Sequence, residues 1–531
     1  MSEQPSTLAR RGVGEWAFRS RRAYANPFAD VVVDAVFSGP SGRTFTVPAF
    51  YDGEATWRVR FSPNVAGEWR YRLLSRPEDP DLTVEGAFEV ADRDARGYLR
   101  AMPGEAWGFQ YESGEPAFIL GDTVYNLFGM AHCGGNVDGF LARRAEQGFN
   151  LLRVRVPVSP FHPPDGYSAW QTRRTWPWGG SEQAPQLDRF DLPYFRTVDA
   201  VVARAEALGI GLEVIMEAWG FEYPFNRRDL FVPEWEELWM RYLIARYDAH
   251  NCVAIWTLMN EYEYYPDGDW RYNPVADRWA LRMARWVKAT APHGHIVAVH
   301  NGPRVPPFAR RFQQDPDAID AIMFQDWGTR DRDLGWLAAG IEEQIATSLE
   351  GWGGSAILAE WGYERNPDLP SLIPSHEYCG EDHTRRGAWR GAFSALGIIH
   401  GFENSWGPFM LLDEDQPGMA HLLQLRRFFT EIVPFQPLRR AWELAAGDSA
   451  ESGQRPLALA APEGDLIAVY LPVGGAVEVV MPRGEGEYRA RWFNPVSGAL
   501  LAAEGAGGRF AAPDVTYLGH PQDWVLLLEA K

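Results

Sequence analysis

Two glutamates that end otherwise apolar segments carry the clearest chemical signal in this sequence. Glu261 closes the run VAIWTLMNE directly after Asn260, and Glu360 follows the apolar residues AILA. Two carboxyl groups about 5–5.5 Å apart suit retaining hydrolysis of a glycosidic bond, because one donates a proton while the other attacks the anomeric carbon. Either glutamate alone could be a strand-end residue paired with one of the many arginines. Together they predict a catalytic pair.

Polar residues near the ends of two earlier apolar runs are further candidates. Asp122, near the end of run 117–123, could bind two sugar hydroxyls with its two oxygens, or could be a turn or N-cap aspartate. Arg153 and Arg155 alternate onto one face of run 149–158. An interior arginine there could hold a carboxylate ionised, or could form a structural ion pair.

Two more runs end in residues that could contact a ligand. Trp219 follows run 209–218 and could form a stacking wall or pack in the core. His300 and Asn301 end run 295–301 as a polar pair, although a lone histidine is usually a structural residue. Three spare acids nearby are expected to be solvated loop carboxylates: Glu217, Glu263 and Glu364.

Metal and cofactor motifs are missing from the sequence. It contains no Walker A loop, no HExxH, no GxSxG and no Asp/His cluster with metal spacing. The three cysteines are scattered and odd in number, which argues against a disulfide framework or a structural zinc site. We expect no cofactor and no metal.

The candidate residues need a scaffold that gathers strand ends at one place. Between residues 105 and 432, eight apolar runs alternate with amphipathic helical segments: 117–123, 149–158, 209–218, 253–261, 295–301, 318–326, 355–361 and 397–406. Continuous apolar runs are typical of parallel strands covered on both faces. The pattern predicts an α/β fold, a (β/α)₈ TIM barrel, with catalytic residues at the carboxyl ends of the strands. The helix between the fifth and sixth runs is weak.

The segments before and after the barrel both show the alternating pattern of short β-strands. Short alternating runs separated by turns predict antiparallel β-sandwich domains before and after the barrel. We expect a β-sandwich and linker at 1–104, the barrel at 105–432 and a second sandwich at 433–531. Because the linkers contain apolar residues and prolines, we expect a sandwich, preferably the N-terminal one, to pack firmly on the barrel.

Composition narrows the class of partner. The 51 basic and 71 acidic residues give a net charge of −20, which disfavours nucleic-acid and membrane-surface binding. Aromatic residues make up 14% of the chain, with 23 tryptophans, which suits a sugar-binding site although many must fill the core. Without an apolar leader or an 18-residue apolar stretch, we expect a cytoplasmic protein, or a secreted one whose signal peptide has been removed. The pattern predicts no particular oligomeric state.

At the paired glutamates the sequence resembles a known group of enzymes. IWTLMNEYEY and ILAEWGYE are similar to the acid/base and nucleophile strands of the (β/α)₈ glycoside hydrolase clan that includes family 5 cellulases and mannanases. GDTVYNLF and FLARRAEQGFN resemble the first barrel unit of the apiosidase-like group, many of whose members carry a collagenase label.

The flanking modules extend this resemblance to nearly the whole chain. Glu15-Trp16 and the segments 26–28 and 50–53 resemble the β-sandwich of unknown function that often precedes such barrels. The tail, with WFNP at 492–495 and DWV at 523–525, resembles the collagen-binding-type domain that often follows them.

The resemblance implies roles for individual residues. Glu261 would be the acid/base, Glu360 the nucleophile, and Asn260 would hold the sugar 2-hydroxyl. The clan's strand-two arginine, which would keep the nucleophile ionised, is assigned to Arg155, and Gln325 on strand six would contact the nucleophile. The substrate-binding set that we expect is Asp122, Arg155, Trp219, Asn260, His300, Gln325, Trp361 and Trp406, the last as the platform under the sugar.

These residues predict a retaining β-glycoside hydrolase that acts on small glycosides or oligosaccharides. Apiosides and related plant-polysaccharide side chains are one candidate class, with mannosides, galactosides and furanosides open. A transglycosylase or lyase on the same barrel would share the two glutamates. A non-catalytic glycan-binding protein is the alternative from another class, and the intact glutamate pair speaks against it.

Overall fold

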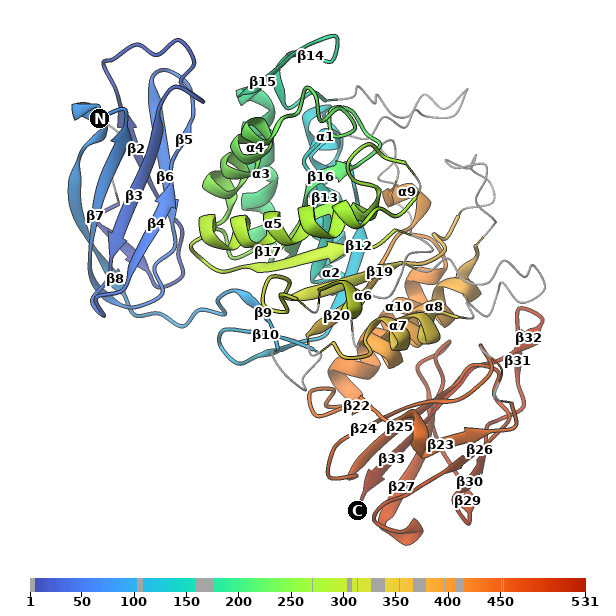
Figure 1. The fold of residues 1–531 in the computed structure, drawn as a ribbon. Coiled ribbons are helices and arrows are strands. Elements are labelled where there is room, and N and C mark those ends of the chain that lie inside the picture. The colour runs from blue at the N-terminus through green and yellow to red at the C-terminus, as the bar shows by residue number, and fades with distance from the viewer. Residues whose placement is uncertain are drawn as a thin grey trace.

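Three parts follow one another along the chain (Figure 1). The computed structural model describes residues 5–102, 108–157, 175–269, 271–302, 308–312, 314–325, 340–352, 354–365, 379–395, 397–406, 415–449, 451 and 453–531. A β module in blue precedes the central barrel, and a second β module in red follows it.

The central part is a closed barrel of parallel strands. Its strands, in spatial order, are β12 (Ile119–Thr123), β13 (Leu151–Arg155), β16 (Gly211–Trp219), β17 (Val253–Asn260), β18 (Ile296–His300), β19 (Ala321–Gln325), β20 (Ser355–Glu360) and β21 (Gly397–His400). The first strand pairs with the last, which closes the ring. Each strand coincides with one of the eight predicted runs, although β16 extends one residue beyond its run 209–218, so the predicted fold class is confirmed.

Helices cover the outside of the barrel. They are α1 (Leu127–His132), α2 (Val137–Glu146), α3 (Leu192–Leu208), α4 (Pro233–Tyr247), α5 (Pro274–Thr290), α6 (Phe308–Phe312), α7 (Ile341–Ser348), α8 (Glu381–Ala395), α9 (Glu403–Trp406) and α10 (Gly418–Arg427). Local sequence sets their ends: the Asp191 carboxylate caps α3 by accepting from Tyr194 N, and Gly209 ends it with φ 71°. The weak helix between the fifth and sixth strands is the short α6. None of the helices in the described ranges has the length and apolar character needed to cross a bilayer.

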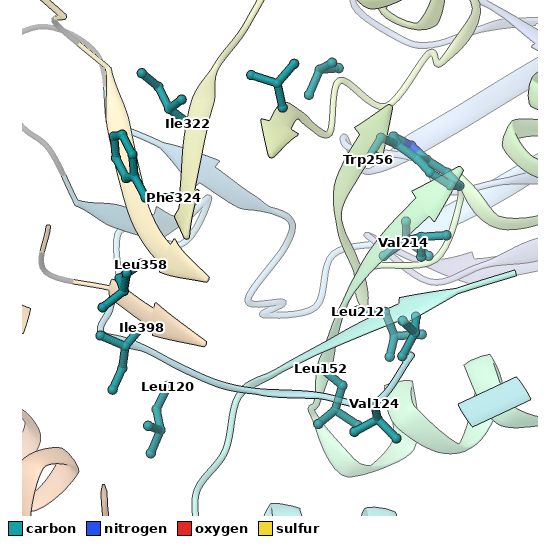
Figure 2. Packing of buried hydrophobic residues seen from close by; sticks show 14 of the residues in the cluster. Leu120, Val124, Leu152, Leu212, Val214, Trp256, Ile322, Phe324, Leu358 and Ile398 are labelled. Carbon is teal, nitrogen blue, oxygen red and sulfur yellow. The ribbon is translucent and has the colours of Figure 1, made fainter. Parts of the chain in front are cut away.

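The two faces of each barrel strand enter different apolar layers. Outward side chains such as Leu120, Leu152, Val214 and Leu358 pack beneath the helices (Figure 2). Inward side chains, Ile255 among them, form a separate cluster inside the barrel. Because both faces are buried, the strands are apolar nearly throughout, and a charged residue within one of them needs a partner.

A small sheet closes the amino-terminal end of the barrel. It consists of β9 (Leu99–Ala101), β10 (Phe109–Tyr111) and β11 (Pro116–Ala117), and its side chains join the inner cluster. The Ser355 hydroxyl donates to the carbonyl of Gly108 and so fastens this sheet to β20. The sequence analysis did not predict this sheet. Because the sheet closes the amino-terminal end, a site can open only at the carboxyl end of the barrel.

The N-terminal module is a β-sandwich. One sheet has the order β1-β8-β7-β3-β4 and the other β2-β6-β5. The strands are β1 (Thr7–Ala9), β2 (Gly14–Arg19), β3 (Val32–Ser38), β4 (Thr44–Pro48), β5 (Phe50–Tyr51), β6 (Thr56–Phe61), β7 (Gly67–Arg76) and β8 (Glu85–Ala91). All pairs are antiparallel except β1 with β8. Aromatic side chains such as Trp16, Phe37 and Trp69 fill the space between the sheets.

The C-terminal module is also built from antiparallel sheets. The larger has the order β22-β24-β25-β33-β27-β28 and the smaller β23-β26-β30-β29. The strands are β22 (Arg439–Arg440), β23 (Ala445–Gly447), β24 (Leu457–Ala460), β25 (Leu466–Leu471), β26 (Ala476–Val479), β27 (Tyr488–Phe493), β28 (Leu500–Ala502), β29 (Gly505–Ala506), β30 (Arg509–Ala511) and β33 (Trp524–Ala530), with a separate pair β31 (Thr516–Tyr517) and β32 (His520–Pro521).

Both sandwiches pack on the barrel, whereas the sequence favoured the N-terminal one. On the N-terminal side, Arg60 and Arg246 both bind the Asp199 carboxylate of α3. On the C-terminal side, Trp389 of α8 stacks on Tyr470 with ring centroids 5.8 Å apart. Apolar residues of the larger C-terminal sheet belong to the same core cluster as the outward side chains of the barrel. The C-terminal contact is therefore a continuation of the barrel core.

Candidate active site

The two predicted catalytic glutamates lie at the carboxyl end of the barrel. Glu360 is the last residue of β20, and Glu261 follows β17 directly. Both are buried, at 4% and 8% exposure respectively. Burial, together with the nearby charge of Glu360, raises the pKa of Glu261 to about 8. Glu261 is therefore mostly protonated at neutral pH, as a general acid must be.

Backbone and side-chain contacts both fix Glu261. Its φ of 52° and ψ of 50° place it in the left-handed region, which costs energy for a residue with a Cβ. Gln325 Nε2 donates to Glu261 Oε1 at 2.6 Å, and Gln325 is itself held by the side chain and carbonyl of Asn301. The sequence placed Gln325 against the nucleophile, whereas in the structure it contacts the expected acid/base.

One oxygen of Glu360 receives hydrogen bonds from two side chains. Tyr125 Oη donates to Glu360 Oε1 at 2.5 Å, and Arg153 Nη1 donates to the same oxygen at 2.6 Å. His300 Nε2 lies 3.7 Å from this oxygen. No hydrogen bond from a described residue reaches Oε2, so this second oxygen is the one available to a substrate.

Arg153 lies at the centre of the site and is fully buried. Besides Glu360, its guanidinium donates to Tyr125 Oη and to Asn260 Oδ1, and its Nε lies 3.3 Å from Glu213 Oε2. Because the Asn260 oxygen faces the arginine, the amide nitrogen is left without a hydrogen-bond partner among the described residues. It is a donor suited to a sugar hydroxyl.

His300 is buried next to this group and is neutral. Burial and the positive charge of Arg153 hold the pKa of His300 well below its usual range. Neither ring nitrogen has a hydrogen-bond partner in the described part of the chain. A neutral imidazole can therefore sit beside Glu360 without competing with Arg153 as a counter-ion.

An aromatic wall borders the glutamate pair. Trp219 belongs to a cluster with Tyr125 and Tyr363, stacks on Phe221 at 5.2 Å, and is covered by the Arg155 guanidinium at 4.4 Å. Trp219 is 5% exposed, because these neighbours cover most of its ring. The described residues contain no cluster of three or more His, Cys, Asp or Glu side chains arranged to hold a metal ion.

Comparison with known families decides the assignment of the barrel. Residues 106–423, more than half of the chain, match the family described as "Apiosidase-like, catalytic domain". The chain belongs to this apiosidase-like family. Residues 10–76 match a domain of unknown function (DUF5060), and residues 443–529 match the "Putative collagen-binding domain of a collagenase". The resemblance seen in the sequence is therefore confirmed for all three parts.

Solved structures share the fold of this apiosidase-like protein. A crystal structure described as a putative glycoside hydrolase from Bacteroides vulgatus is 19% identical, covers 99% of this chain and 100% of its own, and has a TM-score of 0.72. A glycoside hydrolase family 5 structure from the same organism is 18% identical, covers 82% of this chain and 94% of its own, and has a TM-score of 0.61. A search of curated proteins found no match. The chain thus has the fold of glycoside hydrolases.

The choice between the two strand-two arginines was wrong. Arg153, not Arg155, contacts Glu360 in the apiosidase-like barrel. Arg155 lies on the same inward face but two residues further along β13, where it binds Glu222 at 2.9 Å and Asn126 at 3.1 Å. The alternation of side chains correctly predicted that both arginines lie on the same face of the strand. It cannot predict at which position along the strand a side chain meets its partner.

Two predicted substrate contacts lie in the layer between the barrel and the helices. Asp122 is fully buried and accepts hydrogen bonds from Arg144 of α2 and from Ser405. Trp361 is also fully buried, with its ring centroid 4.4 Å from that of His400. None of the contacts of these two side chains in the described structure reaches Glu261 or Glu360, so the structure does not bring them to the glutamate pair. Trp406 ends α9, and its side chain lies outside the described residues.

The three spare acids are buried rather than solvated, so that expectation was also wrong. Glu217 binds Arg228 at 2.7 Å, and Glu263 binds Arg311 at 3.0 Å. Glu364 accepts hydrogen bonds from a backbone N–H and a threonine hydroxyl, and burial raises its pKa to about 7. They brace the loops that follow the barrel strands.

Two residues of the site were missed in the sequence. Tyr125 stands within GDTVYNLF, which was noted only as a family motif. Glu213 is the one acid in the middle of the run GIGLEVIMEA, and an acid at such a position signals a buried partner. Burial raises the pKa of Glu213 to about 7, and Thr257 Oγ1 donates to its Oε1 at 2.6 Å.

Proposed function

We propose that this protein is a retaining glycoside hydrolase in which Glu360 is the nucleophile and Glu261 the acid/base. The observation that carries the proposal is the difference between the two carboxyl environments. Glu360 is held by a cation and a phenol, whereas Glu261 has no ion pair among the described residues and a pKa of about 8. An ion-paired carboxylate beside a carboxyl group that burial keeps protonated is typical of a nucleophile and acid pair.

In the first step, Glu360 Oε2 attacks the anomeric carbon as the bond to the glycosidic oxygen breaks. Glu261 gives its proton to that oxygen, so the leaving group departs as a neutral alcohol and the sugar is esterified to Glu360. Asn260 Nδ2 donates to the sugar 2-hydroxyl, and Arg153 and Tyr125 hold Oε1 in place. Gln325 keeps the acid aimed at the leaving oxygen.

In the second step, Glu261, now a carboxylate, takes a proton from a water molecule that attacks the anomeric carbon. The ester bond breaks, Glu360 leaves as a carboxylate, and the sugar is released with its original configuration. Esterification removes the negative charge of Glu360, which is one cause of the raised pKa of Glu261. The pKa of Glu261 should therefore fall in the intermediate, as a general base requires.

The substrate class that we propose is small β-glycosides or oligosaccharides, including apiosides and other side chains derived from plant polysaccharides. The apiosidase-like family supports this class.

The test is hydrolysis of a panel of aryl β-glycosides, including apioside, mannoside, galactoside and arabinofuranoside. Glu360→Gln should abolish turnover of every glycoside that the wild type cleaves. Glu261→Gln should retain much more activity on a dinitrophenyl glycoside than on an alkyl glycoside, because dinitrophenolate needs no proton. Glu342→Gln is the matched control, since Glu342 is a buried glutamate bound to Arg390 at 2.6 Å outside the site.

Proton NMR of the first-formed product reports the stereochemistry. Retention is expected, and inversion would overturn the double displacement. A fluoro-sugar trap should add its mass to the peptide that contains Glu360, and labelling at Glu261 would reverse the two roles. Sugar transfer to an added acceptor in place of water would favour a transglycosylase on the same residues.

A further inference from the structure

Glu213 is an acidic residue in the interior of the barrel, below the glutamate pair. In register it pairs with Arg153 on one side and with Ile255 on the other. It is fully buried, and nearby inward side chains such as Ala298 and Ile357 are apolar. Placing a carboxyl group at this depth is costly, so its contacts should reveal its role.

The described contacts of Glu213 all lead to the active site or to its own support. Its Oε2 lies 3.3 Å from Arg153 Nε, and its Oε1 accepts from Thr257 Oγ1 at 2.6 Å. Thr257 stands on β17, three residues before Asn260. Arg153 is the cation that contacts Glu213 in the described structure.

The guanidinium of Arg153 has three nitrogens in a rigid plane. Its terminal nitrogens donate three hydrogen bonds, from Nη1 to Glu360 and to Tyr125 and from Nη2 to Asn260. Nε lies 3.3 Å from Glu213 Oε2, an ion pair without hydrogen-bond geometry. An arginine side chain has several rotatable bonds, and this ion pair holds the group at Nε as well as at its terminal nitrogens.

We infer that Glu213 is a positioning residue, which anchors Arg153 at Nε so that its two terminal nitrogens reach Glu360 and Asn260 together. The inference rests on the proposed function of those two residues. Through Arg153, Glu213 would set both the aim of the nucleophile and the contact with the sugar 2-hydroxyl.

A purely structural role is the rival explanation, in which Glu213 only neutralises a buried arginine. Both explanations predict a change in melting temperature when Glu213 is replaced. Only positioning predicts that the reaction will lose its dependence on the 2-hydroxyl, because that dependence passes through Asn260.

The experiment compares Glu213→Gln and Glu213→Leu on a dinitrophenyl glycoside that the wild type cleaves and on its 2-deoxy counterpart. Glutamine keeps an oxygen for Arg153 Nε, so kcat should stay within about threefold of the wild-type value. Leucine has no acceptor, and kcat should fall by about 10²-fold, the loss expected when a reacting group is misplaced by about 1 Å. The preference for the 2-hydroxy substrate should fall about tenfold in Glu213→Leu, which corresponds to about 1.4 kcal/mol.

Two further variants keep the result interpretable. Thr257→Val removes the hydrogen bond that supports Glu213 without changing the volume at that position. It should lower both kcat and the 2-hydroxy preference several-fold, and it serves as the test if Glu213→Leu does not fold. Glu342→Leu removes a comparable buried partner from Arg390 and should leave the 2-hydroxy preference unchanged.

A folded Glu213→Leu variant with wild-type kcat and 2-hydroxy preference would overturn the positioning role, as would an unaffected Thr257→Val if Glu213→Leu does not fold. Failure of the proposed function looks different, because the wild type would then cleave no glycoside or Glu360→Gln would remain active.

Discussion

Replacing Tyr125 by phenylalanine removes a single hydroxyl group from the site and leaves the ring in place. That hydroxyl donates to Glu360 Oε1 at 2.5 Å and accepts from Arg153 Nη1 at 2.7 Å. The ring also packs against Trp219, with centroids 5.3 Å apart, and this contact should survive the substitution. The variant therefore isolates one hydrogen bond to Glu360, the proposed nucleophile.

A hydrogen bond to a charged group contributes about 1.5–3 kcal/mol. Without the phenol, Glu360 Oε1 keeps only the hydrogen bond from Arg153, so the carboxylate is held less firmly. At 1.36 kcal/mol per factor of ten, loss of this hydrogen bond should lower kcat/KM by about 10–100-fold.

The assay is kcat/KM on a dinitrophenyl glycoside at neutral pH. Tyr470→Phe is a matched control, because the Tyr470 hydroxyl also donates to a buried carboxylate, that of Asp523, at 3.1 Å in the C-terminal sandwich. The control should lose stability without a loss of kcat/KM. A folded Tyr125→Phe variant with the wild-type kcat/KM would refute the idea that this hydroxyl holds the proposed nucleophile in place.

Three further predictions concern stability. Burial opposes ionisation of Asp199, but the charges of Arg246 and Arg60 outweigh it and lower the pKa of Asp199 to about 2. Between pH 6 and pH 3, the free energy of unfolding measured in urea should therefore fall by about 1 kcal/mol more for the wild type than for Asp199→Asn. Burial raises the pKa of Glu213 to about 7, so ionising this carboxyl group destabilises the folded protein. Between pH 5 and pH 8, the free energy of unfolding of Glu213→Gln should therefore rise by about 2 kcal/mol relative to that of the wild type. A difference that does not change with pH would contradict this prediction. Trp361→Ala should lower the free energy of unfolding by about 3–5 kcal/mol, measured by thermal denaturation, and leave KM unchanged. A raised KM in a variant of wild-type stability would instead support the predicted contact between Trp361 and the sugar.

The sequence predicted the barrel well because its signal is repeated. Eight apolar runs alternate with amphipathic segments, and an error in one run would not change the architecture. Glu261 and Glu360 were predicted as a pair for a related reason, since catalytic residues of such barrels come from the carboxyl ends of the strands. Both glutamates lie at the carboxyl end of the barrel, as expected.

The remaining site residues depended on information that the strands do not contain. Where both faces of a strand are buried, apolar residues occupy both, so the sequence does not show which face Asp122 or Trp361 occupies. Arg153 and Arg155 share a face, and only the stagger of the barrel decides which one meets Glu360. Tyr125 reaches Glu360 across a sequence separation of 235 residues, and nothing local in the chain records that contact.

The continuous core between the barrel and the C-terminal sandwich bears on how such proteins can be rearranged. Trp389 lies against Tyr470 and Phe493, and Arg385 binds Asp523 at 2.9 Å with both side chains fully shielded from solvent. A gene fusion that cut the chain near residue 435 would expose this apolar surface on both halves. The C-terminal sandwich should therefore be inherited together with its barrel, rather than exchanged between enzymes as a detachable binding module. Chimaeras that swap this domain should need the facing residues of α8 to be swapped with it.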